Sequence, residues 1–160
     1  MSTRHSARFY RLVGLIGTSR LVRRLHPPVY RLTGGRWIVG RNLGMRNVIV
    51  TTVGRRTGRV RDVPLYAVDD GSRLVVIGSF AGRDEEPAWV GNLVAHPDAT
   101  VRVGRQVRPV RAREAEGAER ERLWAMAASA YPGYEAYARR TSRRIPVVVL
   151  EPTGAGEGAA

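Results

Sequence analysis

A short turn bracketed by two glycines carries the clearest chemical signal in this sequence. It reads GRRTG at residues 54–58, and a further arginine follows at Arg61. Arginine is always charged and its forked donors match phosphate, Thr57 adds a hydroxyl, and such a turn allows several backbone N–H groups to converge on one anion. We therefore predict that Arg55, Arg56, Thr57 and Arg61 bind a phosphorylated ligand. The alternative is a solvated hairpin turn whose arginines contact only water.

A second candidate region reads SFAGRDEEPAWVGN at residues 79–92. A loop rich in small residues leads into a helix that we expect to begin near Pro87, and the free N–H groups at a helix N-terminus favour an anion. Trp89 and Asn92 are three residues apart and share a face of that helix. They offer a flat wall and an amide to a ligand. The alternative makes Trp89 a core anchor and Asn92 a helix cap.

The third candidate is a run of tyrosines, Tyr131, Tyr134 and Tyr137, spaced three residues apart. On a helix their phenols lie within about 60° of rotation, so they form one aromatic face with polar tips. This face could line a pocket and donate a proton to a reduced product. The alternative is ordinary packing against a sheet.

The charge of the chain points to an anionic partner. The 160 residues include 27 basic residues, all arginine, against 14 acidic ones, for a net charge of +13. Residues 1–61 hold 14 arginines, and the first carboxylate is Asp62. Nucleic acid, acidic lipid and a phosphorylated small molecule all fit such a charge. The chain has no cysteine and only three scattered histidines, so we expect no metal site.

The apolar pattern predicts six strands, at residues 46–53, 59–68, 73–79, 99–103, 106–114 and 145–151. Helices are expected at 87–96, 116–130 and 134–140. Pro64 within the second strand predicts an edge or a bulge. Short hairpins join most strands and two strands look buried on both faces. These features favour a mainly β (α+β) fold, a six-stranded antiparallel split β-barrel with flanking helices.

The domain organisation expected from the sequence has three parts. Residues 1–35 form a basic N-terminal segment with an amphipathic helix, residues 36–152 form the cofactor-binding barrel, and residues 153–160 form a disordered tail. The apolar run at 12–17 is too short to span a bilayer. The helix, within residues 5–26, is expected to contact an anionic membrane surface, the barrel or a second subunit.

Five motifs in this order resemble the deazaflavin (coenzyme F420)-dependent nitroreductase family of actinobacteria, which are split β-barrel flavin and deazaflavin oxidoreductases. They are TT-x-G-R-x-[ST]-G-x-x-R-x-x-P-L at 51–65, S-x-x-G at 79–82, P-x-W-x-x-N-L at 87–93, the tyrosines at 131–137 and I-P-V-V-V at 145–149. The resemblance covers about residues 30–152. Two positions depart from the family pattern: Phe80 stands where lysine is frequent, and Gly91 stands where histidine is common.

The resemblance implies an enzyme that uses reduced F420, an 8-hydroxy-5-deazaflavin with a phosphodiester and a polyglutamate tail, to transfer hydride to a quinone, a nitroaromatic or a similar acceptor. It assigns the phosphate and tail to Arg55, Arg56, Thr57 and Arg61. It assigns the ring to Pro64, Leu65, Tyr66, Ile77, Gly78, Ser79, Ala88, Trp89, Val90, Gly91, Asn92 and Tyr134. Tyr134 also faces the substrate as the implied proton donor, flanked by Tyr131 and Tyr137, and Ser79 is a second candidate catalytic residue.

Other functions stay open on the sequence. An FMN-binding split barrel is the nearest alternative, and a basic module that binds nucleic acid or a membrane surface is more distant. Nucleic acid is disfavoured because no reader motif is present and no aromatic residues alternate with the basic strands. We expect a cytoplasmic protein, with peripheral contact at the inner face of the plasma membrane as one option. A homodimer is another open option.

Overall fold

The computed structural model describes residues 45–154 of the chain. The predicted N-terminal helix and residues 155–160 of the predicted tail lie outside the described residues. The first residue of that tail, Thr153, donates its N–H to the Pro109 carbonyl at 3.2 Å. Within residues 45–154, no helix is both long and apolar enough to cross a bilayer.

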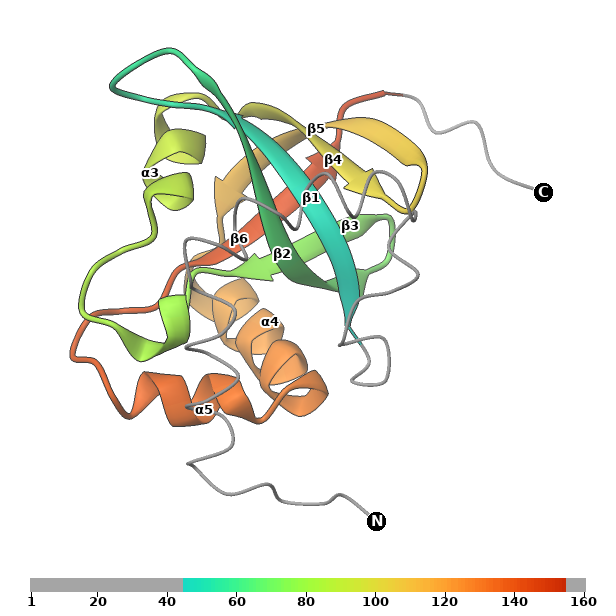
Figure 1. Cartoon of the computed structure of the whole chain (residues 1–160). Coiled ribbons are helices and arrows are strands. Elements are labelled where there is room, and N and C mark those ends of the chain that lie inside the picture. Colours follow the sequence, from blue (N-terminus) through green and yellow to red (C-terminus); the bar gives the residue numbers. More distant parts are fainter. Residues whose placement is uncertain (1–44, 155–160) are drawn as a thin grey trace.

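Six antiparallel strands close into a barrel in the order β1-β2-β3-β6-β5-β4 (Figure 1). Their bounds are β1 Arg46–Val53, β2 Val60–Asp70, β3 Arg73–Ile77, β4 Asp98–Val103, β5 Gln106–Glu114 and β6 Val147–Pro152. Two-residue turns join β2 to β3 and β4 to β5, and each contains a glycine with positive φ, Gly71 at 64° and Gly104 at 60°. The predicted six-stranded antiparallel fold is confirmed.

The barrel has a core inside it and another outside it. Along β6, Val148 and Leu150 pack in the interior cluster, whereas Val147 and Val149 pack in the outer cluster. Successive side chains of a strand point to opposite faces, so β6 is buried on both sides. Both cores are supplied by β6, which is why it reads as a continuous apolar run, whereas β1 supplies Val48 and Val50 to the interior cluster.

Helices cover the two cores differently. The short helix α3 (Ala88–Ala95) places Trp89, Val90 and Leu93 in the interior cluster. The helices α4 (Gly117–Ala130) and α5 (Gly133–Ala138) cover the outer cluster and lie together below the barrel in Figure 1. A turn of 3-10 helix, η1 (Phe80–Gly82), contacts α5. The three predicted helices are thus present, with small shifts at their ends.

The strand β2 has a free edge at Pro64. It pairs with β1 over residues 60–67 but with β3 only over residues 67–70. Pro64 has no N–H to donate, so it fits a position with a partner on one side only. The predicted edge is confirmed, and among the described strands the barrel is split along the first half of β2.

A network of ion pairs fastens α4 to the barrel. Asp70 pairs with Arg73 and accepts from Arg122 at 2.8 and 3.0 Å, while Glu119 accepts from Arg113 at 2.6 Å and from Arg73 at 3.0 Å. Hydrogen bonds from Arg122 and Arg113, respectively, are the largest causes that lower the pKa of Asp70 and of Glu119 to about 2. The network belongs to the scaffold, and none of its residues is among the predicted site residues.

Candidate active site

The hairpin between β1 and β2 is a tight turn closed by its own backbone. Gly54 N–H donates to the Arg59 carbonyl at 2.8 Å, and the N–H groups of Thr57 and Gly58 donate to the Gly54 carbonyl at 3.1 and 2.7 Å. Gly58 has φ of 64°, and a Cβ at Gly54 would lie 2.9 Å from Thr57 Oγ1. Both glycines are needed for this turn, since one adopts a left-handed conformation and the other has no room for a side chain.

Helix α3 holds the hairpin through Asn92. Its Oδ1 accepts a hydrogen bond from Arg55 N–H at 3.1 Å, and its Nδ2 donates to Thr52 Oγ1 at 3.3 Å. Both Asn92 and Thr52 are buried. Asn92 is therefore neither an exposed ligand amide nor a helix cap; it is a buried link that fixes the hairpin on α3.

The Arg55 side chain lies against the backbone of α3 at Gly91. A Cβ on Gly91 would lie 1.8 Å from Arg55 Nη1 and 2.6 Å from Arg55 Cζ. Any larger residue at position 91 would therefore displace the guanidinium. The departure at Gly91 thus has a structural consequence in this chain, because the missing side chain leaves the space in which Arg55 rests.

The predicted convergence of backbone N–H groups on an anion is wrong. The N–H groups of residues 54, 55, 57 and 58 have partners within the protein, and that of Arg59 contacts Thr57 Oγ1 at 3.4 Å. Side chains are left to bind an anion. Among the described residues, no carboxylate lies within 4.0 Å of a nitrogen of Arg55, Arg56, Arg59 or Arg61.

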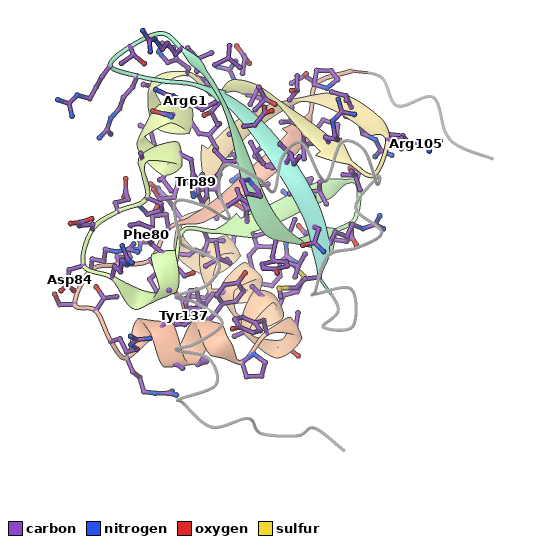
Figure 2. All side chains as sticks on the ribbon, viewed as in Figure 1. Arg61, Phe80, Asp84, Trp89, Arg105 and Tyr137 are labelled. Carbon is purple, nitrogen blue, oxygen red and sulfur yellow. The ribbon has the colours of Figure 1, made fainter. Side chains whose placement is uncertain are left out.

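These four arginines therefore form an exposed basic hairpin, which we call the arginine hairpin (residues 55–61). Figure 2 shows Arg61 above α3, with nitrogen-tipped side chains fanning from the turn beside it. Arg105 lies at the opposite side of the molecule in the same view. Arg59 belongs to the hairpin although sequence reasoning gave it no role.

A left-handed turn follows β3 at the predicted loop. Phe80, Ala81 and Gly82 have φ of 44°, 56° and 74°, and Gly82 N–H donates to the Ser79 carbonyl at 2.9 Å. Left-handed backbone at residues other than glycine costs on the order of 1–3 kcal/mol each, and it persists where surrounding structure fixes it. The Arg83 guanidinium lies over the Phe80 ring at 4.9 Å, so that cation is engaged locally.

The left-handed turn is packed between two helices. A Cβ at Gly78 would lie 3.0 Å from Val90 Cγ2 of α3, and one at Gly82 would lie 2.7 Å from the Tyr137 carbonyl of α5. The absence of side chains at both glycines allows this approach. Ser79, between them, is buried and thus has its place set by both helices.

The predicted tyrosines lie together in the outer core. The hydroxyls of Tyr131 and Tyr137 are 3.1 Å apart, the rings of Tyr131 and Tyr134 meet edge to face at 5.2 Å, and Tyr134 donates to Met45 Sδ at 3.8 Å. Tyr134 is only 6% exposed. Burial, and to a lesser extent Tyr137 and Tyr66, raises the pKa of Tyr134, so its phenol keeps its proton. The structure therefore shows these rings packed in the core. Their spacing in the sequence is compatible with either core packing or the wall of a pocket.

The remaining predicted residues divide between surface and core. On β2, Tyr66 is 37% exposed, and burial and Tyr137 raise its pKa. Pro64 is half-buried and Ala88 is exposed. The other four pack into hydrophobic clusters: Leu65, Trp89 and Val90 contribute to the interior core and Ile77 contributes to the outer core. For Trp89, the core-anchor alternative describes what the structure shows.

Contacts join the predicted segments into one packed unit. Arg55 rests on α3, Gly78 abuts Val90 of the same helix, and Gly82 abuts Tyr137 of α5. The motifs contain Thr52 and Gly82, but sequence reasoning assigned neither residue a role; Thr52 accepts from Asn92, and Gly82 abuts α5. Sequence reasoning missed Arg143 altogether, because it acts on backbone carbonyls distant in sequence.

Two solved structures share this fold at substantial identity. One, described as an F420-H2-dependent reductase (FDR-A), is 39% identical with a TM-score of 0.62, over 66% of this chain and 94% of that chain. Another, described as a domain-swapped dimer, is 35% identical with a TM-score of 0.64, over 82% of this chain and 97% of that chain. The fold and its likeness to these structures place the chain among the split-barrel oxidoreductases.

The family follows from the sequence match. The family described as F420H(2)-dependent quinone reductase matches residues 22–152, and the chain belongs to it. The F420H(2)-dependent quinone reductase Rv1261c of Mycobacterium tuberculosis is 33% identical, over 79% of this chain and 87% of the relative. The predicted F420-dependent oxidoreductase family is confirmed, and the match favours F420 over FMN.

Proposed function

We propose that this chain binds reduced F420 along the arginine hairpin, the left-handed turn and the tyrosine cluster, and reduces a quinone to a hydroquinone. When bound, the cofactor supplies a hydride from C5 of its deazaflavin ring. The observation that carries the proposal is the arginine hairpin, four cations without carboxylate partners among the described residues. Asn92 fixes it on α3, the helix whose Val90 packs against Gly78 before the left-handed turn. A hydride and one further proton convert a quinone to a hydroquinone, so the site must bind an anion, a flat ring and an acceptor.

The arginine hairpin fits the phosphodiester and acidic tail that the resemblance implies. Arg55, Arg56 and Arg61 are the proposed donors, with Thr57 as a hydroxyl partner and Arg59 as an added cation. Each charge-assisted hydrogen bond contributes about 1.5–3 kcal/mol net, so three contribute about 4.5–9 kcal/mol, against about 8 kcal/mol for a micromolar Kd. Contacts with the ring must supply the rest of the affinity. Because the N–H groups of residues 54, 55, 57 and 58 already have partners, side chains are proposed to make these hydrogen bonds.

The ring is proposed to lie against backbone and small surfaces. Pro64, Tyr66, the backbone of Gly78 and Ser79, and Ala88 are the residues that would touch it. Leu65, Ile77, Trp89 and Val90 support these residues from the two cores, and Gly91 and Asn92 act through Arg55. Ser79 is proposed to present its hydroxyl to the reacting end of the ring.

Tyr134 remains the proposed proton donor, with Tyr131 and Tyr137 beside it. Its raised pKa keeps the phenol protonated at neutral pH, which a donor to the reduced quinone requires. Its hydroxyl rests on Met45 Sδ, a weak acceptor, and can turn to a better one at little cost. Tyr134→Phe should lower kcat while leaving the Kd for F420 within about twofold, because the lost hydroxyl touches no tail group.

Fluorescence titration of F420 tests the binding site. The double variant Arg56→Ala/Arg61→Ala should raise the Kd at least tenfold by removing two charge-assisted contacts. Arg105→Ala/Arg108→Ala is the matched control, since it removes the same charge from the β4–β5 hairpin. Equal weakening by both pairs would mean that only net charge matters, and absence of micromolar binding by the natural chain would refute the proposal.

The acceptor is tested by stopped-flow oxidation of reduced F420. A quinone is proposed to oxidise it faster than a nitroaromatic, in keeping with the family. If the purified protein is yellow with bound FMN and does not bind F420, the assignment of F420 as the cofactor is refuted. Peripheral membrane contact through residues 5–26 and homodimer formation stay predictions; liposome sedimentation with and without residues 1–26, and light scattering in solution, measure them.

A further inference from the structure

One arginine between α5 and β6 binds the backbone carbonyls on both sides of the left-handed turn. Arg143 donates from Nη2 to the carbonyls of Gly78 and Ser79, both at 2.9 Å, and from Nε to the carbonyl of Arg83 at 2.8 Å. These bonds span 60 to 65 residues of sequence. The three carbonyls bracket Phe80, Ala81 and Gly82, so one planar guanidinium closes the ends of the turn.

The turn needs such an external restraint. Phe80 and Ala81 both hold left-handed φ, and inside the turn only the bonds from Gly82 N–H to Ser79 and from Arg83 N–H to Phe80 close it. A second tie comes from the same connection, because Thr141 Oγ1 donates to Asp84 Oδ1 at 2.8 Å. Residues 141–143 thus hold the segment from both sides.

Arg143 is poorly placed to act as a stabilising ion pair. Among the described residues no carboxylate lies within 4.0 Å of it, and its Nη1 is buried without a hydrogen-bond partner. Burial lowers the pKa of Arg143, because a charge removed from water is disfavoured. Arg143 is half-buried, and Glu86 and Asp84 act on its pKa only through space, so it is a weak source of ion-pair stability. The geometry of the turn better explains why it is there.

We propose that Arg143 is a positioning residue for the reaction: it fixes the Gly78 and Ser79 backbone against α5, and thereby sets Ser79 relative to Tyr134 and Tyr137. The proposal rests on the proposed function, in which Ser79 and the tyrosines border the reacting groups. Gly82 already meets the Tyr137 carbonyl with no space for a Cβ, so a shift of the turn changes that spacing directly. Misplacement by about 1 Å lowers turnover up to about a hundredfold.

The test compares Arg143→Ala and Arg143→Lys with Arg144→Ala, an exposed neighbour that removes the same charge. Oxidation of reduced F420 by menadione is followed under stopped flow, alongside the Kd for F420. Arg143→Ala should lower kcat by about ten- to a hundredfold with the Kd for F420 changed less than about threefold, since the arginine hairpin is untouched. Arg143→Lys should recover little, because an ammonium cannot reach three carbonyls as a fork does.

Chemical rescue separates positioning from folding. Millimolar guanidinium chloride should restore turnover to Arg143→Ala by refilling the site, and should not change Arg144→Ala. Hydrogen exchange without cofactor gives an independent readout: the amides of residues 80–86 should exchange faster in Arg143→Ala, while those of β1 and β6 keep their protection.

The possible results separate a positioning role of Arg143 from no role and from a general role in folding. An unchanged kcat with unchanged hydrogen exchange in Arg143→Ala would overturn the proposal. A loss of activity that comes with global loss of protection, and that guanidinium does not reverse, would also overturn it. If the natural chain fails to oxidise reduced F420 with menadione, the proposed function fails, and the exchange result alone decides whether Arg143 holds the turn.

Discussion

Replacing Gly91 with alanine tests whether Arg55 acts from its resting place on α3. The new Cβ would lie 1.8 Å from Arg55 Nη1 and 2.6 Å from Cζ, so one of the two groups must move. The contacted atoms are the far end of a flexible, exposed side chain, and the guanidinium will move rather than the helix. Alanine also favours a helix interior over glycine by about 0.8–1 kcal/mol, so we expect the free energy of unfolding to hold or to rise by up to about 1 kcal/mol.

The effect should instead fall on cofactor binding. A guanidinium released from α3 must be ordered again when the acidic tail binds, and ordering one such side chain costs about 0.5–1.5 kcal/mol. That range corresponds to a Kd for F420 raised about two- to thirteenfold. Fluorescence titration measures it, and thermal or urea unfolding of the same preparations measures stability.

The Arg55→Ala background provides the control. If Gly91 acts through Arg55, then Gly91→Ala should have no further effect once Arg55 is truncated, and the double-mutant cycle should return a coupling of the same size as the single effect. Equal weakening in both backgrounds would mean that the methyl group meets the cofactor itself. A marked loss of stability would mean that the helix, not the arginine, had yielded, and either result refutes the reasoning.

Three further predictions concern the supports of the site and the scaffold. Asn92→Ala should lower the free energy of unfolding in urea by about 1–3 kcal/mol, since the buried Thr52 hydroxyl and the Arg55 N–H lose a partner; an unchanged curve would contradict this. Gly71→Ala should cost about 1–2 kcal/mol for its left-handed φ alone, and Gly82→Ala should cost more because its Cβ would also meet the Tyr137 carbonyl at 2.7 Å; equal losses would refute the contact. Asp70 and Glu119 have folded pKa values of about 2, below the ordinary 3.8 and 4.5, so their stabilisation is present above those ordinary values and is lost as pH falls toward 2. We expect about 1 kcal/mol from each after solvent screening, with a shallower acid limb of the unfolding curve in Asp70→Asn/Glu119→Gln.

The barrel could be predicted because its determinants are local. Valine-rich runs specify β1 and β6 as strands buried on two faces, and Gly71 and Gly104 take the positive φ that their two-residue turns require. Pro64 marked the free edge of β2 by chemistry alone, since it has no N–H. Such features depend on residues within a few positions of each other, which is the range over which a sequence pattern is informative.

The supports of the site could not be predicted because they join distant residues through backbone. Asn92 reaches the Arg55 N–H across 37 positions, and Arg143 reaches the Gly78 carbonyl across 65. Every residue offers an N–H or a carbonyl, so the acceptor of such a bond leaves no mark in the sequence. The tyrosine run shows the converse limit: a spacing of three residues identifies a shared face but not whether that face packs or binds.

The two ends of the proposed site therefore depend on different physics. On the arginine hairpin most backbone N–H groups are already used, so an anion meets mainly side chains. Long side chains tolerate variation in the length and position of an acidic tail, and their contacts weaken as salt rises. At the left-handed turn the surface is backbone, held by Arg143 and by two glycines packed against α3 and α5. The flexible cations of the arginine hairpin suit binding of the tail. Hydride transfer instead requires the ring and the acceptor to meet at a fixed distance, and the left-handed turn, which is the rigid element, is the one proposed to border the reacting groups.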